Sequence, residues 1–307
     1  MQRNAAIVIG VVVVVVAAIV GFLVFGGRGD EEPSPTPEPS SAAPSPSPTF
    51  NAAMLEQPWT ILYVGTDVNE GRAEAGQPVN TDALMLVHLS EDQSTLTLVS
   101  LPRDTVDLPL PDGGTYQGKI NGVYSTQGLD TLVGMMETLY DVPIDGHVVL
   151  DMDDFESLVA AVDGVDVDPP EPISDPAHNV VIEAGPQELD APTALGYVRT
   201  RVDQDYGRMG RQQEVIMALI DRLVDPEREV DLGSLLDGLD SLETDLPLEE
   251  LPTLMELARR ATEAEVQTLV IQPPLITFEG DRGDGRGYIL EPDVEAIRAE
   301  VQSLIGE

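Results

Sequence analysis

A long apolar run near the amino terminus is the feature that most limits how this chain can fold. The run extends over 21 residues, Ala5–Phe25, and contains no charged side chain. As a helix it would span roughly 31 Å, the thickness of a bilayer core. It is longer than the hydrophobic region of a cleaved signal peptide. Residues 1–28 therefore predict a short cytoplasmic tip followed by one uncleaved transmembrane signal anchor.

The charges around this run indicate its orientation. Arg3 and the terminal amine precede it, whereas Arg28 is followed by three acidic residues. Because cytoplasmic flanks carry an excess of positive charge, the amino terminus is expected in the cytoplasm. The sequence predicts a single-pass protein of the cell membrane with an extracytoplasmic main domain.

Residues 29–56 have the composition of a stalk. Residues 33–49 read PSPTPEPSSAAPSPSPT. Segments of this kind are semi-extended, form no core and act as spacers. The first strand-like pattern follows this stretch, so a single folded domain is expected over residues 57–307.

The charge balance restricts the partners of that domain. The chain has 16 basic and 55 acidic residues and a formal net charge of -39. Nucleic-acid binding requires a basic surface, so nucleic acid is not an expected partner. The absence of cysteine excludes disulfides, thiol nucleophiles and thiolate metal sites.

Strand-length apolar runs and amphipathic helical patterns alternate from residue 57 onward. The patterns predict strands at 60–65, 83–89, 95–101, 147–150 and 266–271, and an edge strand at 165–168. They predict helices at 129–140, 153–162, 190–196, 208–223, 232–239, 248–261 and 293–305. This alternation indicates an α/β fold of the α-β-α sandwich type, in which helices flank one central mixed sheet.

Four arginines gather within a short stretch of this acidic chain. Arg199 and Arg201 lie two residues apart and would share a face if that stretch is extended. Arg208 and Arg211 lie three residues apart and would share a face of a helix. Guanidinium groups arranged in pairs suit phosphate oxygens, so the stretch predicts a site for a strongly charged anion.

Two acids and two further cations fall where strands end. Asp67 follows the first predicted strand and Asp82 precedes the second. Two carboxylates at one rim suit Mg²⁺, which takes one or two carboxylates together with phosphate and water. Arg103 follows the third strand, and Lys119, the single lysine of the chain, lies in a glycine-containing loop. These groups all fall in loops or at strand ends, where we expect them to meet at one mouth.

Six short motifs occur in one order along the chain. They are Gly-Thr-Asp at 65–67, Thr-Asp-Ala-Leu-Met-Leu at 81–86, Leu-Pro-Arg-Asp-Thr at 101–105, Lys-Ile-Asn at 119–121, Tyr-Val-Arg-Thr-Arg at 197–201 and Gly-Arg-Met-Gly-Arg-Gln-Gln at 207–213. Together they resemble the LytR-CpsA-Psr family over about residues 60–225. The anchor and stalk also look like those of that family.

The resemblance implies a glycopolymer–peptidoglycan phosphotransferase. Such an enzyme moves a glycopolymer from a polyprenyl-pyrophosphate carrier to an acceptor hydroxyl of the cell wall, usually on peptidoglycan. Asp67 and Asp82 look like the family's metal-associated acids, for Mg²⁺ with Mn²⁺ as an alternative. The cations that look like its pyrophosphate-binding residues are Arg103, Lys119, Arg199, Arg201, Arg208 and, in a supporting place, Arg211. The residues expected to act in catalysis are Asp82, Arg103, Arg199 and Arg201.

Two departures from the family pattern keep an alternative open. Asn80 stands where the family commonly has an arginine, and Ala83 stands where a hydroxyl residue is usual. A neutral amide can donate to a phosphate oxygen but supplies no charge, and a charge-assisted hydrogen bond contributes roughly 1.5–3 kcal/mol. A non-catalytic carrier or sensor that binds polyprenyl pyrophosphate is therefore the second hypothesis.

A third hypothesis is an acidic, calcium-binding adhesion domain. It is suggested by six aspartates: Asp151, Asp153, Asp154, Asp163, Asp166 and Asp168. They lack the spacing of a calcium-binding loop with its distal glutamate.

The motifs identify no general base, since His88 and His147 both fall in predicted strands. Arg222 lies outside the motifs, and its loss is expected to affect transfer far less than the loss of Arg199 or Arg201.

Overall fold

The computed structural model describes residues 50–68, 71, 79–176, 180–224, 243–247 and 250–306. The predicted anchor over 1–28, most of the predicted stalk and the predicted helix at 232–239 lie outside these residues. Within the described ranges, no helix is both long enough and apolar enough to cross a membrane. The transmembrane helix therefore stays a prediction.

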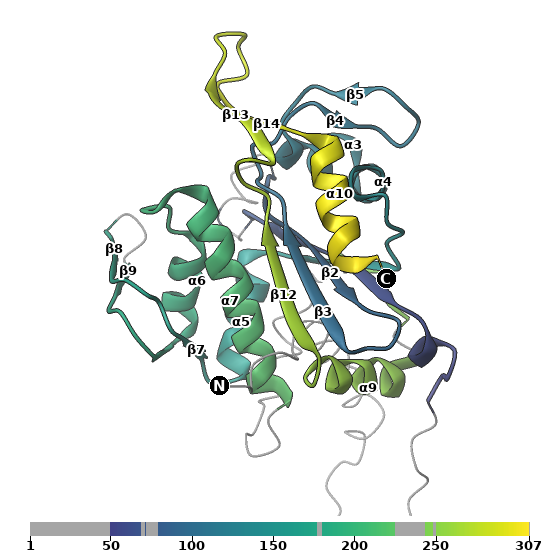
Figure 1. Ribbon diagram of the computed structural model, residues 1–307. Helices are drawn as coiled ribbons and strands as arrows, with labels where there is room; N and C mark the ends of the chain where they lie inside the picture. The colour runs from purple at the N-terminus through teal and green to yellow at the C-terminus, as the bar shows by residue number, and fades with distance from the viewer. Residues whose placement is uncertain are drawn as a thin grey trace, which may run out of the picture.

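A six-stranded mixed sheet forms the centre of the domain (Figure 1), as predicted. The strand order is β11-β6-β1-β2-β3-β12. Strand β1 pairs with β2 antiparallel and with β6 parallel, and β3 pairs with β12 parallel. The strands are β1 (Trp59–Thr66), β2 (Thr81–Leu89), β3 (Thr95–Ser100), β6 (Gly146–Leu150), β11 (Glu243–Thr244) and β12 (Glu265–Val270).

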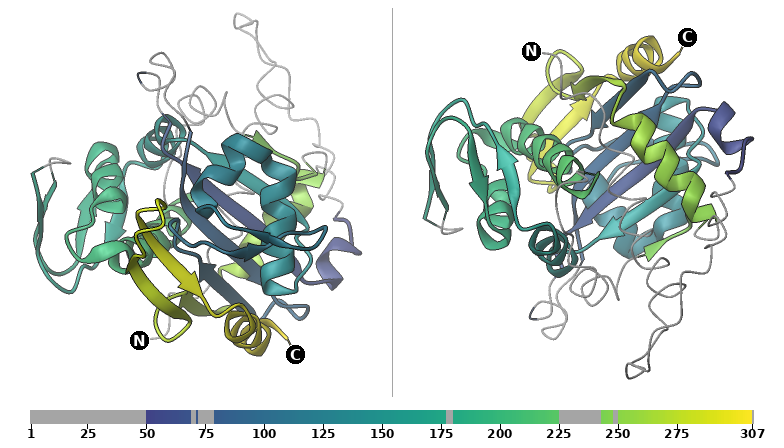
Figure 2. Two further views of the ribbon diagram at one scale, coloured as in Figure 1. Left: turned by 90° about the horizontal axis from the view of Figure 1, so that it is seen from above. Right: turned by 90° about the horizontal axis from the view of Figure 1, so that it is seen from below.

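Both faces of the sheet are buried. Successive side chains of a strand point to opposite faces, so one strand contributes side chains to both cores. Ile61 and Tyr63 of β1 pack into one core cluster, and Leu62 and Val64 pack into the other. This arrangement explains why β1 and β2 read as continuous apolar runs rather than as alternating patterns. The sheet is thus the middle layer of three, with helices on each side (Figure 2).

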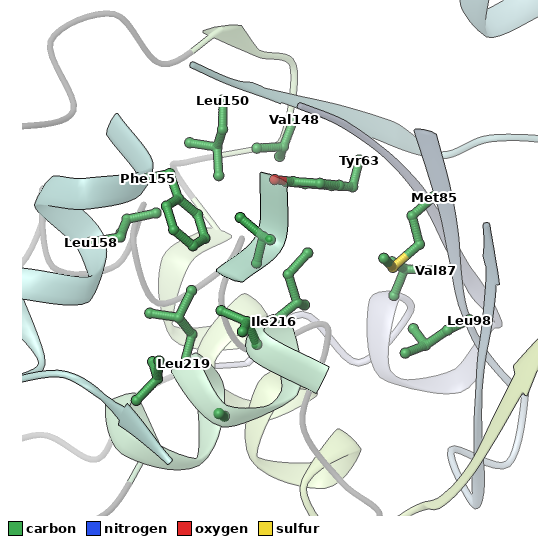
Figure 3. Close-up of a cluster of buried hydrophobic side chains, with 14 of the residues drawn as sticks. Tyr63, Met85, Val87, Leu98, Val148, Leu150, Phe155, Leu158, Ile216 and Leu219 are labelled. Atoms are coloured by element: carbon green, nitrogen blue, oxygen red, sulfur yellow. The ribbon is translucent and has the colours of Figure 1, made fainter. Parts of the chain in front are cut away.

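The helices divide between the two faces. Those on the first face contribute to the cluster around Tyr63, part of which is shown in Figure 3, and are α5 (Met152–Ala161), α6 (Ala191–Arg199), α7 (Gln204–Val224) and α9 (Leu251–Ala261). Those on the second face are α3 (Val123–Gln127), α4 (Leu129–Tyr140) and α10 (Val294–Ile305). The predicted α-β-α arrangement is confirmed.

Four small two-stranded sheets surround this frame. They are β4 (Leu108–Pro109) with β5 (Thr115–Tyr116), β7 (Val165–Val167) with β10 (Gln187–Leu189), β8 (Ile173–Asp175) with β9 (Val180–Ile182), and β13 (Ile276–Asp281) with β14 (Tyr288–Pro292). Of these strands, only β7 matches a predicted one. The β13–β14 hairpin projects from the edge of the domain above the ends of β3 and β12 (Figure 1).

Packed structure begins a few residues before the predicted boundary at residue 57. Met54–Glu56 form a short 3-10 turn, η1, and Met54 is buried in the core. The Trp59 indole nitrogen donates to the Met54 carbonyl at 2.9 Å. The Asn51 amide donates to the Thr253 hydroxyl at 2.8 Å. The last residues assigned to the stalk are therefore part of the folded domain.

Candidate functional site

The site lies at the edge of the sheet where β1 and β3 end and β2 begins. Asp67 directly follows β1, and its amide donates to the carbonyl of Asn80 at 2.9 Å. Asp82 is the second residue of β2. Because β1 and β2 are antiparallel, the two carboxylates are delivered to one rim, as the sequence predicted. Arg103 lies in the turn after β3 and reaches the same rim.

The opposite side of the site is built by α6 and α7. Asp190 caps α6 by accepting from the Thr193 amide at 3.0 Å, and Pro192 stands in its first turn. The helix continues through Gly196 to Arg199, so the expected extended stretch at Arg199 and Arg201 is wrong. The physical reason is packing: Ala194, Tyr197 and Val198 are buried on one helical face.

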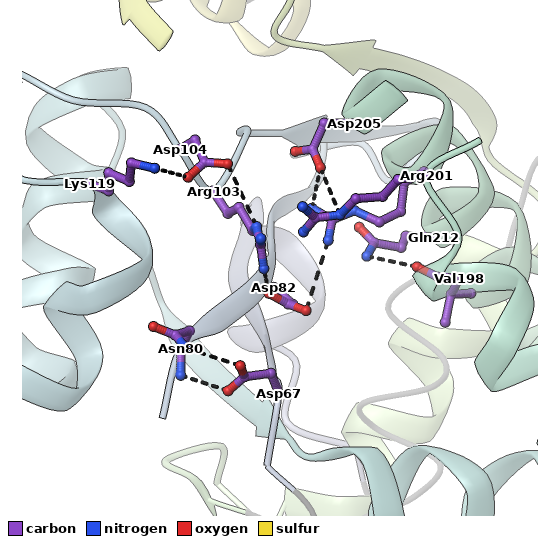
Figure 4. Close-up of polar contacts among 11 residues, drawn as sticks. Asp67, Asn80, Asp82, Arg103, Asp104, Lys119, Val198, Arg201, Asp205 and Gln212 are labelled. Atoms are coloured by element: carbon purple, nitrogen blue, oxygen red, sulfur yellow. Dashed lines mark hydrogen bonds and ion pairs between the residues drawn. The ribbon is translucent and has the colours of Figure 1, made fainter. Parts of the chain in front are cut away.

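Carboxylates link the cations of the rim into one network (Figure 4). A guanidinium nitrogen of Arg103 contacts Asp82, and its Nε lies 3.8 Å from Asp104 Oδ2. Lys119 Nζ lies 2.8 Å from Asp104 Oδ1. Burial alone would lower the pKa of Arg103, but the neighbouring Asp82 carboxylate more than offsets it and raises the pKa.

Arg208 is the centre of the network on the helix side. Its Nη2 lies 2.9 Å from Asp205 Oδ1, and its Nη1 lies 3.9 Å from Asp82 Oδ2. Arg201 Nε lies 3.5 Å from the same Asp205 oxygen. Arg208 is only 1% exposed, yet its Nε and Nη2 donate no hydrogen bond of good geometry, since the Asp205 contact is close but poorly aligned.

This incomplete partnering has an electrostatic consequence. Burial lowers the pKa of Arg208 to about 10, because its neighbours do not fully replace the lost water. The side chain remains a cation at neutral pH with unused donors. The side chain of Arg199, in the last turn of α6, has no hydrogen bond or ion pair to any other described residue. Two guanidinium groups of the rim are therefore available to an anion.

Arg211 occupies a different place from the one expected for a phosphate contact. It is buried behind the rim, and its Nε donates to the Tyr197 carbonyl at 2.9 Å. Its Nη2 donates to the Thr200 carbonyl at 2.5 Å, and its Nη1 pairs with Asp203 at 2.6 Å. These bonds hold the loop between α6 and α7, so Arg211 supports the positions of Arg199 and Arg201.

An apolar pocket opens beneath these cations, between the sheet and the layer of α5, α6 and α7. Its empty volume is about 510 Å³ with the mouth included. Asp82, Arg199 and Arg208 stand among its lining residues. The apolar part of the lining comes from Tyr63, Ala83, Leu150, Met152, Phe155, Leu195, Val198 and Ile216. The space thus joins an apolar interior to charged groups.

The sequence did not identify these apolar lining residues. β1 and β2 are apolar on both faces, so spacing gives no sign of which side chains border a cavity. One signal was available on α7, where Arg208, Gln212 and Ile216 recur every fourth residue and all three line the pocket. Along this single face of α7, the side chains change from a charged group through an amide to an apolar group.

The two aspartates can supply part of a metal shell. Asp67 is 8% exposed and accepts from the backbone amide and the side-chain amide of Asn80, at 2.8 and 3.0 Å. Among the described residues, no group of three or more His, Cys, Asp or Glu side chains could hold a metal ion. A divalent ion here would need other oxygens, and Mg²⁺ commonly takes them from phosphate and water. The donor set fits an ion shared with a phosphate ligand.

Other candidates from the sequence have structural roles. Asp151 and Asp154 form the capping box of α5, and Asp166 pairs with Arg222. The calcium-binding hypothesis therefore loses three of its six aspartates to these contacts. His88 is buried and shares a 2.9 Å hydrogen bond with the Thr60 hydroxyl. His147 Nδ1 lies 3.1 Å from Asp245, away from the residues that line the pocket.

Proteins of known structure share this fold. A crystal structure of Bacillus subtilis TagV is 27% identical, with a TM-score of 0.63, and the match covers 81% of this chain and 98% of that one. A structure of TagT bound to LIIa-WTA is 23% identical, with a TM-score of 0.62, and the match covers 85% and 94% of the two chains. Because TagT is only 23% identical, its likeness to this chain shows the fold alone.

Sequence comparison gives relatives with transferase names. The polyisoprenyl-teichoic acid–peptidoglycan teichoic acid transferase TagV of Bacillus subtilis is 29% identical over 81% of this chain and 65% of its own length. The transferase of the same description named TagU from Halalkalibacterium halodurans is 29% identical over 80% and 78%. A model of the LytR_cpsA_psr family matches residues 33–300. The chain belongs to the LytR_cpsA_psr family.

Proposed function

We propose that the protein transfers a glycopolymer from a polyprenyl-pyrophosphate carrier to a hydroxyl group of the cell wall, most simply on peptidoglycan. The observation that carries this proposal is the pocket, which joins an apolar interior to Asp82, Arg199 and Arg208. Such a pocket suits a ligand with an apolar chain and a strongly anionic head. The family and the transferase names of the relatives support the same activity.

The reaction is a phosphoryl transfer. The acceptor oxygen attacks the phosphorus that carries the polymer, a new P–O bond forms, and the bond to the bridging oxygen breaks. Polyprenyl phosphate leaves with that bond's electron pair, and the acceptor proton passes to solvent. Phosphoryl transfer requires mainly positioning and charge neutralisation, which fixed guanidinium groups provide.

The roles of individual residues follow from their places. Arg208 has buried donors without aligned acceptors, and phosphate oxygens would supply acceptors. Arg199 and Arg201 flank it, and Arg103 reaches the same rim through Asp82. Lys119 lies beyond Asp104, at the outer end of the network. We assign to these five cations the binding of the pyrophosphate and to Arg211 the support of the α6–α7 loop.

Asp67 and Asp82 are the residues that would hold Mg²⁺. When bound, the ion would neutralise charge on the diphosphate. Asp82 also pairs with Arg103 and Arg208, and Asn80 orients Asp67. Asn80 thus donates to the Asp67 carboxylate rather than to the phosphate. At this position the family commonly has an arginine, and no other charge takes its place there.

The test uses the full-length protein in detergent with a lipid-linked glycopolymer, Mg²⁺ and peptidoglycan. Covalent attachment of polymer to peptidoglycan is the expected result. Tight binding of the carrier lipid with no product would favour the non-catalytic carrier or sensor. Failure to bind a polyprenyl diphosphate at all would contradict both readings of the pocket.

A further inference from the structure

The β13–β14 hairpin carries an aromatic and carboxylate surface beside the site. Glu279 of β13 accepts hydrogen bonds from two tyrosines, through Oε2 from Tyr206 at 3.0 Å and through Oε1 from Tyr288. Tyr206 belongs to the first turn of α7, directly after Asp205. Tyr288 begins β14 and is 50% exposed. One carboxylate therefore fixes two phenol rings, one of which is open to solvent.

Backbone contacts place this hairpin against the rim of cations. The Leu290 amide of β14 donates to the Asp104 carbonyl at 3.1 Å, and the Val106 amide donates to the Leu290 carbonyl at 3.0 Å. Asp104 is also the partner of Lys119 and a neighbour of Arg103. The hairpin is thus attached to the phosphate site through Asp104 on one side and through Tyr206 of α7 on the other. Viewed from above, it lies between α7 and the ends of the sheet strands (Figure 2).

A third contact fixes the tip of the hairpin. Arg286 Nη1 donates to Asp107 Oδ2 at 3.0 Å and to the Gln117 carbonyl at 3.2 Å, and Gln117 precedes Lys119 by two residues. With three attachments the surface is held in place before any ligand arrives. Preorganised aromatic side chains bind at a low entropic cost, because tyrosine has few rotatable bonds and a large amphipathic face.

Exposed tyrosine beside a carboxylate suits a sugar, whose apolar ring face lies on the phenol while its hydroxyls donate to carboxylate oxygens. The charge of this surface discriminates between two possible sugar ligands, a neutral saccharide and a phosphate-rich polymer. Arg282 and Arg286 of the hairpin pair with Glu291 and Asp284. The exposed carboxylates of Glu279 and Asp281 remain in excess. These two carboxylates, in a chain of net charge -39, disfavour a phosphate-rich polymer. They tolerate a neutral saccharide.

We propose that Tyr206, Glu279 and Tyr288 form a subsite for a neutral saccharide unit of the acceptor glycan, next to the bound diphosphate. The inference rests on the proposed function, since it names the side from which the acceptor hydroxyl approaches. The subsite lies outside the apolar pocket and shares none of its lining residues. Its ligand and that of the pocket can therefore be measured separately.

The experiment measures binding to the full-length protein in detergent by saturation-transfer NMR. The probes are a tetrasaccharide of N-acetylglucosamine for the acceptor, poly(glycerol phosphate) for a donor polymer, and geranylgeranyl diphosphate for the pocket. The variants are Tyr288→Ala, Tyr288→Phe, which keeps the ring, and Glu279→Gln. Val181→Ala is the matched control, because Val181 is 74% exposed on β9. Thermal unfolding verifies that each variant is folded.

We expect Tyr288→Ala to weaken tetrasaccharide binding at least tenfold, with Tyr288→Phe and Val181→Ala within threefold of the wild type. Geranylgeranyl diphosphate should bind all variants equally. The proposal is overturned if the wild type does not bind the tetrasaccharide, if Tyr288→Ala binds it normally, or if poly(glycerol phosphate) is the probe whose binding is lost. Intact diphosphate binding in those cases would leave the proposed function standing.

Discussion

Two of the three buried arginines of helix α7 have surroundings that differ. Arg208, near its start, is 1% exposed, and Arg222, near its end, is 2% exposed. Arg222 donates to both oxygens of Asp166, at 3.0 and 2.8 Å, to Glu188 at 2.5 Å and to the Asp163 carbonyl at 3.2 Å. Arg208 has two nitrogens without a hydrogen bond. Both arginines are thus buried, but Arg222 has enough hydrogen-bond acceptors around it and Arg208 does not.

The pKa values shift in opposite directions for the same reason. Burial would lower the pKa of each guanidinium, and for Arg208 it does so, to about 10. For Arg222 the hydrogen bonds that it donates to Asp166 and Glu188, together with the charges of these carboxylates, outweigh burial and raise the pKa. A buried cation with satisfied donors is costly to remove, whereas a buried cation with unsatisfied donors can offer them to a ligand. The predictions below test this distinction, from the largest expected effect to the smallest.

Replacing Arg208 should have the largest effect on activity. We expect Arg208→Gln to lower kcat/KM for polymer transfer about 10³-fold, or ~4 kcal/mol, because a buried charge facing the phosphates is lost. The free energy of unfolding should change by less than about 1 kcal/mol, since the native contacts of Arg208 are incomplete. Arg208→Lys is the control, which keeps the charge and loses the fork. Transfer at the wild-type rate in Arg208→Gln would contradict the comparison.

Replacing Arg222 should instead reduce stability. The sequence places Arg222 outside the motifs, but its burial makes it unsuitable as a neutral control. We expect Arg222→Ala to lower the free energy of unfolding by about 3 kcal/mol. The value is at the low end for a buried pair, because Asp166 and Glu188 are 67% and 56% exposed and regain water. Urea unfolding measures the loss, and kcat/KM of the folded fraction should stay within twofold.

His88 is a buried titratable side chain whose lost hydration is not compensated by a carboxylate or a ligand. Burial lowers the pKa of His88 to about 4, against 6.5 in the unfolded chain. Between these values the unfolded state binds a proton that the folded state does not, so stability falls as the pH decreases from 6.5 to 4. The difference amounts to at most about 3 kcal/mol. Urea unfolding of His88→Gln at pH 7, 5 and 4 should show a weaker pH dependence than the wild type, and equal slopes would exclude this histidine as the cause.

The remaining rim arginines should give intermediate losses of activity. We expect Arg199→Ala to lower kcat/KM about 100-fold, because Arg199 lines the pocket and has no described partner. Arg201→Ala should lower it about 10-fold, since Arg201 is 38% exposed and already pairs with Asp205. Arg259→Ala is the matched control, because Arg259 is 55% exposed on α9. A loss in Arg259→Ala equal to that in Arg199→Ala would show that net charge rather than position matters.

Local pattern was sufficient for five of the six strands of the central sheet and for most helices, but it missed the two-residue edge strand β11. The strands at β1, β2 and β3 are apolar runs buried on both faces, and α4 and α5 have helical spacing that their packing preserves. Local pattern failed at α6, where Gly196 looks like a helix end but buried neighbours carry the helix on to Arg199. It also missed the β13–β14 hairpin, in which Ile276, Ile289 and Leu290 are buried but most of the other side chains are polar or exposed.

The sequence by itself determined the family motifs, the kind of chemistry they carry and the strands that deliver them to one rim, because these depend on residue type and short spacing. The tertiary structure alone decided which arginines have enough acceptors, where the apolar pocket lies and what stands beside it. The ion-pair partners, such as Asp82 for Arg208 and Glu188 for Arg222, come from distant parts of the chain. Their distances are set only when the layers pack, so no local pattern can predict them.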